Sequence, residues 1–100
     1  MIQKEDILNF LRNNSEYLHR NFQVTEIGLF GSFARNEQNE DSDIDLLVEF
    51  ESGINDLFSL KQTLRNFLTE NLGKDVEICR EKYLKPYAKP QIQKEVIYVT

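Results

Sequence analysis

The chain has 100 residues, a length that favours one small domain, and we expect residues 1–100 to form it. Hydrophobic residues make up 40% and charged residues 29%, which is typical of an ordinary globular domain and excludes a disordered one. The formal net charge of −5 argues against sequence-independent binding to nucleic acid, which needs a basic face. We therefore expect no direct nucleic-acid binding, although a nucleotide that arrives with a divalent cation remains compatible with this charge.

Cysteine usage and hydropathy predict a cytoplasmic protein without membrane contact. Cys79 is the single cysteine, so an intrachain disulfide is excluded and a reducing compartment is indicated. The N-terminal segment carries charges throughout, unlike a signal peptide. No apolar run approaches the roughly 18 residues of a membrane span.

The first half of the chain predicts a helix, a strand and a second, short helix. Apolar residues at helical spacing indicate a helix from Gln3 to about His19. Residues 24–30 are rich in β-formers and predict a strand. Gly31 ends this strand, and residues 32–35 suit the first turn of a short helix with Ser32 as N-cap. Residues 36–42 are expected to form a polar loop.

The second half predicts two more strands, a long helix and an extended tail. Residues 43–50 form a strand whose centre, residues 46–48, is apolar enough for burial on both faces. A helix capped by Asn55 or Asp56 ends at Gly73, and residues 75–80 alternate as a third strand. Residues 91–95 suit a short helix, and residues 96–99 an extended tail. This order predicts an α/β (α+β) fold with one small mixed sheet and helices packed against it, in a strand order that the pattern leaves open.

Two aspartates stand where the second strand begins. Asp43 and Asp45 are two apart, so on a strand both side chains share a face about 6–7 Å apart, with Ile44 turned into the core. Two carboxylates at that separation repel by about 2–3 kcal/mol at an effective dielectric constant near 20. We infer that a cation is held between them.

Two further features extend this candidate site. Glu77 on the third strand supplies another carboxylate, and oxygen ligands suit a hard cation such as Mg²⁺. Gly31 and Ser32, at a predicted helix N-terminus, would offer backbone N–H groups and a hydroxyl to phosphate oxygens. These parts together indicate phosphoryl or nucleotidyl transfer.

The segments GSFAR and SDIDLLVEF, residues 31–35 and 42–50, resemble the signature of the DNA polymerase β-like nucleotidyltransferase superfamily. The chain most resembles the minimal nucleotidyltransferases (MNT), including its tail KPYAKPQIQKEVIYV. The resemblance implies a polymerase β-like palm fold, a two-ion Mg²⁺ site and ATP as substrate. MNT proteins are antitoxins of HEPN-domain ribonuclease toxins, and some transfer AMP to a tyrosine of the toxin. We therefore expect an adenylyltransferase with a HEPN partner, and a homo- or hetero-oligomer is compatible with this.

The resemblance also assigns roles to individual residues. Gly31 and Ser32 match the phosphate-binding pair, and Asp43 and Asp45 match the metal ligands. Glu77 completes the catalytic and metal-binding set, at a position where the family usually has aspartate. Arg35 completes the nucleotide-binding set and could face a phosphate. Asn36 replaces a frequent glycine and, like glycine, tolerates a left-handed backbone.

Other interpretations of the same residues stay open. The domain could neutralise its partner by binding alone, with a site made inactive by Glu77, or it could be one half of a transferase for a small molecule. Arg35 could be a salt-bridging surface residue, and Ser32 only a helix cap. The tail tyrosines, Tyr83, Tyr87 and Tyr98, could belong to the core edge or to an interface.

Overall fold

A computed structural model of the chain describes residues 2–99. Its helices are α1 (Lys4–Asn13), α2 (Ser15–Phe22), α3 (Leu57–Leu72), the 3₁₀ turn η1 (Glu81–Tyr83) and α4 (Lys89–Glu95). Its strands are β1 (Val24–Phe30), β2 (Ile44–Phe50), β3 (Val76–Cys79) and β4 (Ile97–Val99). None of the helices within residues 2–99 has the length and apolar character needed to cross a membrane.

The four strands form one mixed sheet in the order β3-β2-β1-β4. β1 pairs antiparallel with both β2 and β4, whereas β2 and β3 run parallel. The α3 crossover makes the β2–β3 pairing possible, since parallel neighbours need a long connection between them. The expected mixed sheet with packed helices is confirmed.

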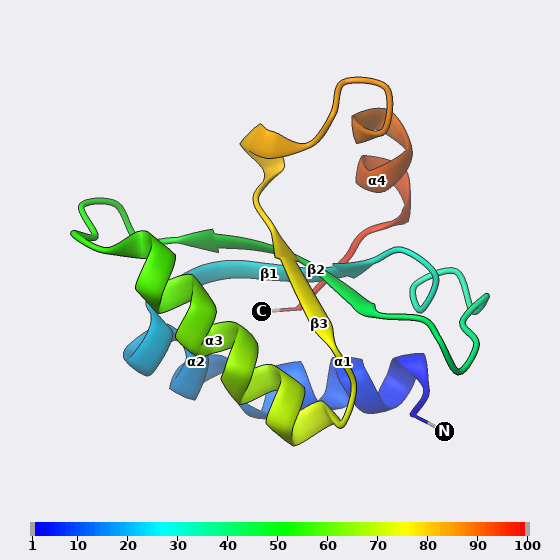
Figure 1. The fold of residues 1–100 in the computed structure, drawn as a ribbon, viewed down its shortest axis with the longest axis horizontal. Helices are drawn as coiled ribbons and strands as arrows, with labels where there is room; N and C mark the ends of the chain where they lie inside the picture. Colours follow the sequence, from blue (N-terminus) through cyan, green and yellow to red (C-terminus); the bar gives the residue numbers. More distant parts are fainter. Residues whose placement is uncertain (1, 100) are drawn as a thin grey trace.

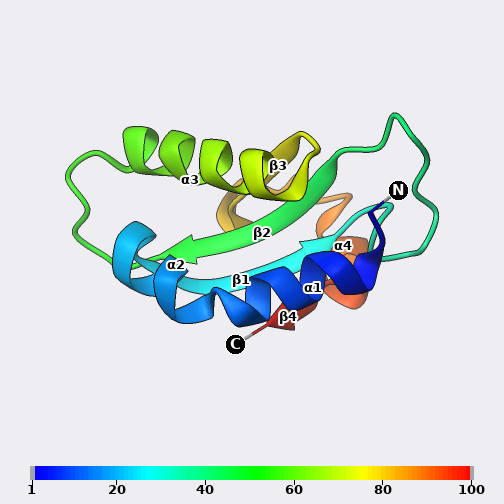
Figure 2. The ribbon, with the colours of Figure 1, turned by 90° about the horizontal axis from the view of Figure 1, so that it is seen from below.

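The helices are distributed unequally over the two faces of the sheet. α1, α2 and α3 lie together on one face, and α4 lies on the other (Figure 1). Seen from below, α3 lies on the β2–β3 side of the sheet and the α1–α2 pair on the β1–β4 side (Figure 2). The contacts of α3 with β3, of α2 with β1 and of α1 with β4 agree with this view. The face opposite α1–α3 is therefore the more accessible one.

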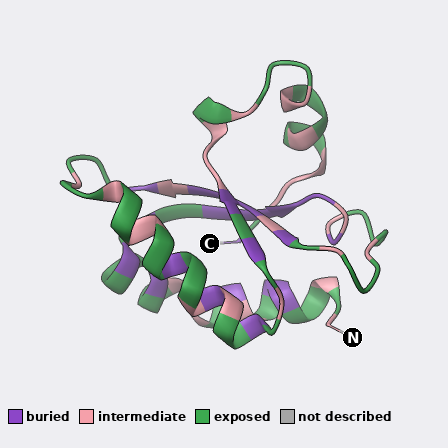
Figure 3. Ribbon diagram, viewed as in Figure 1, coloured by how far each residue is buried: buried purple, intermediate pink, exposed green. Residues whose placement is uncertain are grey.

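The core fills the layer between the sheet and the three helices. Alternating strand residues point into it, among them Ile44, Leu46 and Val48 on β2. Leu47 points to the opposite face and is also buried, so the prediction that this strand is covered on both faces is confirmed. Residues 79–98 contain no buried residue, and the η1–α4 segment accordingly lies over the sheet as an exposed arm (Figure 3).

The N-terminal helix differs from its prediction, because two helices replace one. α1 ends at Asn14, whose backbone leaves the helical region at φ −109° and ψ 12° and whose side chain donates to the carbonyl of Phe10. This local hydrogen bond competes with helix continuation. α2 then extends past His19 to Phe22 and ends on Gln23 in the left-handed conformation.

Three other element boundaries also differ from the predictions. Residues 32–36 form consecutive turns instead of a short helix, so Ser32 caps no helix. These turns end at Asn36 with φ +58°, the left-handed backbone expected for asparagine. β2 begins at Ile44, one residue later than predicted, and β3 covers only Val76–Cys79.

The observed bounds of the long helix and the tail elements agree better with the predictions. Asp56 caps α3 by accepting from the Ser59 amide, and Gly73 ends it in the left-handed conformation, both as predicted. The short tail helix begins two residues earlier than predicted, with Pro90 in its first turn, where no N–H is needed. The extended tail becomes β4 because it pairs with β1.

Candidate active site

The predicted site residues lie where β1 ends and β2 and β3 begin. Asp45 is the register partner of Phe30, the last residue of β1, and of Glu77 on β3. Register partners share a face, and Ile44 is fully buried towards the helices, so Asp45 and Glu77 both project from the accessible face. The structure thus brings two of the three predicted carboxylates side by side.

Asp45 sits in an environment that opposes its ionisation. Partial burial raises its pKa to about 6, and the negative charges of Glu77 and Asp43 add to this effect, while Arg35 acts in the opposite direction. Burial and like charges both disfavour the carboxylate form. Glu77 and Asp43 are therefore both close enough to act electrostatically on Asp45.

Asp43 and Glu77 are exposed and line a shared depression of about 400 Å³ at the β3 edge of the sheet. Lys61 and Arg65 of α3 line its other side. The sequence reasoning missed these two cations, although their spacing of four on one helix places them on a common face. Arg65 also donates to the carbonyl of Val76, which ties α3 to the start of β3.

No group of three or more carboxylate, histidine or cysteine side chains within residues 2–99 is already arranged to hold a metal ion. The donor set nevertheless suits a hard divalent cation, because Asp43, Asp45 and Glu77 offer only oxygen. Burial and the neighbouring charges of Glu77 and Asp43 raise the pKa of Asp45, and a bound cation would favour its ionised form.

Gly31 directly follows β1, and its backbone lies close to the Asp45 side chain. Its φ is +79°, and a Cβ built on it would collide with Oδ2 of Asp45. Both observations require glycine, since other residues rarely adopt this backbone and none has the space. The Gly31 turn is consequently packed directly against the central aspartate of the site.

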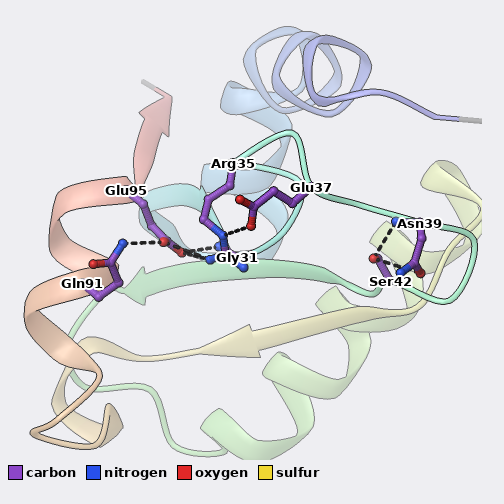
Figure 4. A network of polar contacts seen from close by, with 7 residues as sticks. All are labelled: Gly31, Arg35, Glu37, Asn39, Ser42, Gln91 and Glu95. Atoms are coloured by element: carbon purple, nitrogen blue, oxygen red, sulfur yellow. Dashed lines mark hydrogen bonds and ion pairs between the residues drawn. The ribbon is translucent and has the colours of Figure 1, made fainter.

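A carboxylate from the distant tail completes this turn. Oε2 of Glu95, at the end of α4, accepts the Gly31 N–H at 2.7 Å, and Arg35 Nη1 donates to both Glu95 oxygens at 3.0 Å (Figure 4). Gln91 donates to Oε1 at 3.3 Å, and Arg35 Nε also donates to Glu37 at 2.8 Å. Arg35 is thus salt-bridged on two sides, and the Gly31 amide is already hydrogen-bonded.

Glu95 is held as a carboxylate by this network. Burial favours its neutral form, but the hydrogen bonds from Gly31, Arg35 and Gln91 outweigh burial and lower its pKa. Sequence reasoning missed Glu95 because it lies 64 residues beyond Gly31 and belongs to no recognisable motif. Only the fold of the tail over the sheet brings the two together.

The loop between the turn and Asp43 has its own hydrogen bonds. The Asn39 amide donates to the Ser42 hydroxyl at 2.9 Å, and the Ser42 amide returns a bond to the Asn39 carbonyl at 3.1 Å (Figure 4). Lys74 Nζ binds the carbonyl of Glu40 at 2.8 Å, and the Ile44 amide binds the carbonyl of Asp75 at 2.9 Å. These contacts anchor the loop against the α3–β3 connection and hold Asp43 next to the start of β2.

Comparison with known proteins identifies the family of this chain. The family model described as the nucleotidyltransferase domain matches residues 11–99. This chain belongs to the nucleotidyltransferase domain family. The matched range includes Asp43, Asp45, Glu77, the Gly31 turn and Glu95, so the whole candidate site of this nucleotidyltransferase lies within it.

Two relatives that match this nucleotidyltransferase over nearly their whole length are named as protein adenylyltransferases. The protein adenylyltransferase MntA of Thermococcus cleftensis is 37% identical over 99 residues, covering 99% of this chain and 98% of the relative. A Methanocaldococcus jannaschii protein, provisionally named a protein adenylyltransferase, is 39% identical over 95 residues and covers 94% of this chain and 95% of the relative.

Solved structures share the fold. A structure provisionally described as a minimal nucleotidyltransferase has a TM-score of 0.76 at 34% identity and covers 96% of this chain and 95% of the other. A toxin–antitoxin structure determined with AMP-PNP has a TM-score of 0.66 at 22% identity, covering 87% of this nucleotidyltransferase and 70% of that chain. At that identity the second likeness shows the fold alone.

Proposed function

We propose that this nucleotidyltransferase transfers AMP from ATP to a hydroxyl of a protein partner, a tyrosine of a HEPN-domain toxin, and thereby acts as an antitoxin. The observation that carries the proposal is the placement of Asp45 between Glu77 and the Gly31 turn, with Asp43 close enough to raise the Asp45 pKa. A carboxylate cluster beside a tight strand-to-turn junction suits the charge of a nucleotide that carries divalent cations.

The proposed roles follow from position. Asp43, Asp45 and Glu77 would hold Mg²⁺, which when bound neutralises the phosphate charge and orients the α-phosphate for attack. Ser32, partly exposed beside Gly31, is placed to meet a phosphate oxygen with its amide and hydroxyl. Arg35, with 40% of its side chain exposed, offers a positive charge to the same phosphates.

The reaction itself requires no covalent intermediate on the protein. The acceptor oxygen forms a bond to the α-phosphorus, the bond from that phosphorus to the β-bridging oxygen breaks, and pyrophosphate leaves. The acceptor proton passes to a carboxylate, a role we give to Glu77 because it is exposed on the face where an acceptor would approach. The names of the adenylyltransferase relatives support this reaction for the present chain.

A second candidate function is neutralisation of the partner by binding alone. Glu77 favours it, because this position usually carries aspartate in the family that the chain resembles, and a glutamate is one methylene longer. The extra methylene shifts the carboxylate relative to Asp45, its register partner.

One experiment separates the two functions. The purified chain and its candidate partner are incubated with Mg²⁺ and each nucleoside triphosphate in turn, and the partner is weighed by intact mass spectrometry. We expect a mass gain matching AMP with ATP, and loss of that gain in Asp43→Asn and in Asp45→Asn. Glu70→Gln, an exposed charge removal on α3, is the matched control and should retain full transfer.

Two results would contradict the proposal, one its site residues and the other its catalytic activity. Full transfer by either aspartate variant would show that the site is assigned to the wrong residues. A stable complex that silences the partner without any mass change, and that survives both aspartate substitutions, would establish the binding-only function.

A further inference from the structure

We propose that Glu95 is a positioning residue of the nucleotide site: it fixes the Gly31 turn and the Arg35 guanidinium in the geometry that receives a triphosphate. The inference rests on the proposed function, since it presumes that this turn meets a nucleotide. Three features of the Glu95 contacts carry it.

The first feature is convergence. Donors from Gly31, Arg35 and Gln91 all meet at one carboxylate, with donor–acceptor distances between 2.7 and 3.3 Å. A carboxylate has about four acceptor positions, so this set nearly saturates it. The tail helix α4 is thereby fastened to the residue that packs against Asp45.

The second feature is burial. The Glu95 side chain is 9% exposed, whereas Glu37, the other partner of Arg35, is 65% exposed. Exposed ion pairs contribute little to holding a side chain, while a hydrogen-bonded pair shielded from water is stronger. Glu95 is therefore the better shielded of the two carboxylates that hold the Arg35 guanidinium.

The third feature is what these contacts hold. Gly31 adopts a positive φ beside Asp45, where a Cβ would have no space, so any loosening of its amide moves the turn, Ser32 included, relative to the carboxylates. Arg35 is fixed on two sides and still has 40% of its side chain exposed to meet an anion. A site held in its binding geometry loses less entropy when the ligand arrives.

A competing interpretation makes the opposite prediction. A carboxylate on an amide and a guanidinium occupies donors that a phosphate could use, so Glu95 could block the nucleotide. Against this, displacing Glu95 would leave the amide of the buried Gly31 without its acceptor and Arg35 without its shielded partner, both of which are costly. The structure therefore favours Glu95 as a permanent part of the site, with Ser32 and the exposed side of Arg35 left to meet phosphate.

The test compares Glu95→Ala with Glu95→Gln. The alanine variant removes every contact. The glutamine variant keeps one acceptor oxygen for the Gly31 N–H, but loses the charge and the second acceptor oxygen. Glu16→Gln, which breaks an exposed ion pair with Arg20, is the matched control. Calorimetric titration with ATP and Mg²⁺ gives Kd, steady-state transfer gives KM and kcat, and hydrogen exchange reports the Gly31 amide. All measurements are made below the unfolding transition of the least stable variant.

We expect Kd and KM for ATP to rise about tenfold in Glu95→Ala, with a smaller change in kcat, because the Gly31 turn and the Arg35 guanidinium are then no longer held in place for the nucleotide. Glu95→Gln should restore slow exchange of the Gly31 amide and part of the affinity, and Glu16→Gln should match wild type. Combining Glu95→Gln with Arg35→Gln should be no worse than Arg35→Gln alone, because both act through the same guanidinium.

An unchanged Kd in Glu95→Ala, or a lower one, would overturn the inference, and a lower one would establish that Glu95 competes with the nucleotide. A wild-type chain that binds ATP but transfers nothing would instead overturn the proposed function, while the Kd comparison still decides the role of Glu95. A wild-type chain that does not bind ATP at all would overturn both.

Discussion

At the residue scale, Asp45 is the position where stability and function oppose each other. Burial and two neighbouring carboxylates raise its pKa to about 6, so the folded state binds a proton there more tightly than the unfolded chain does. A carboxyl group of this kind stabilises the fold most below about pH 4, and that contribution is lost as the pH rises to about 6. The site thus tolerates a locally unfavourable charge, which a bound cation would offset.

Asp45→Asn should therefore stabilise the fold near neutral pH while abolishing transfer. The amide keeps the shape and removes the charge, and we expect a gain of about 1–2 kcal/mol in the free energy of unfolding, after discounting for partial exposure. The gain should grow between about pH 4 and pH 6 and stay constant above it. Urea unfolding of both proteins across this range measures it. A gain that is independent of pH would mean that the charge is not its cause.

At the scale of single elements, helix ends show how local backbone geometry constrains the sequence. α2 and α3 both end in the left-handed conformation, at Gln23 with φ +57° and at Gly73 with φ +74°. Glycine adopts this region freely, whereas a side chain makes it unfavourable by about 1–2 kcal/mol. α3 thus has the preferred residue at its end, and α2 does not.

Substitutions at these two positions should have opposite effects. Gly73→Ala should lower the free energy of unfolding by about 1 kcal/mol, and purely through backbone strain, because a Cβ there meets nothing within 4 Å. Gln23→Gly should raise it by about 0.5 kcal/mol, since its backbone bonds to His19 and Glu51 do not need the side chain. Equilibrium denaturation of both variants against wild type decides the signs; equal signs would contradict the backbone explanation.

At the scale of the whole molecule, the core and the site are joined through Phe33. This residue lies between Ser32 and Arg35 in the turn, yet its side chain is fully buried, among the largest buried side chains of residues 2–99. The turn that presents Ser32 and Arg35 is therefore anchored in the same core as α1, α3 and the sheet. We therefore expect a loss of packing at Phe33 to displace the turn that carries Ser32 and Arg35.

Phe33→Leu should lower the free energy of unfolding by about 1–2 kcal/mol and weaken ATP binding, because the smaller side chain leaves space beneath the turn. Phe58→Leu is the matched control: Phe58 is 80% exposed, so we expect a change of less than about 0.5 kcal/mol and unaltered affinity. Denaturant unfolding and ATP titration measure both properties. Equal effects of the two substitutions would contradict a special role for Phe33.

The exposure of the tail tyrosines answers a question that the sequence left open. Tyr83 and Tyr87 are 72% and 82% exposed, so neither belongs to the core. Tyr98 is 41% exposed and lies against Gly28, where a Cβ would meet its ring at 2.8 Å. It therefore covers part of the sheet at Gly28.

The sequence by itself determined the elements that depend on local pattern, and its motifs predicted the family and a candidate site. Hydrophobic periodicity located α3 and the strands, cap residues located its ends, and the Asp-x-Asp spacing with its upstream Gly-Ser pair indicated the site and the family. The break between α1 and α2 escaped prediction, because it depends on one side-chain hydrogen bond of Asn14.

Three features were decided only by the tertiary structure. They are the strand order, the lack of space for a Cβ at Gly31, and the contact between Glu95 and the Gly31 turn. Each depends on contacts between residues far apart in the chain: Asp45 with Glu77, and Gly31 with Glu95. Periodicity reports which face of an element is buried, not which distant residue covers it. The hydrogen bond between Glu95 and the Gly31 turn is for that reason seen in the fold and was not predictable from the sequence.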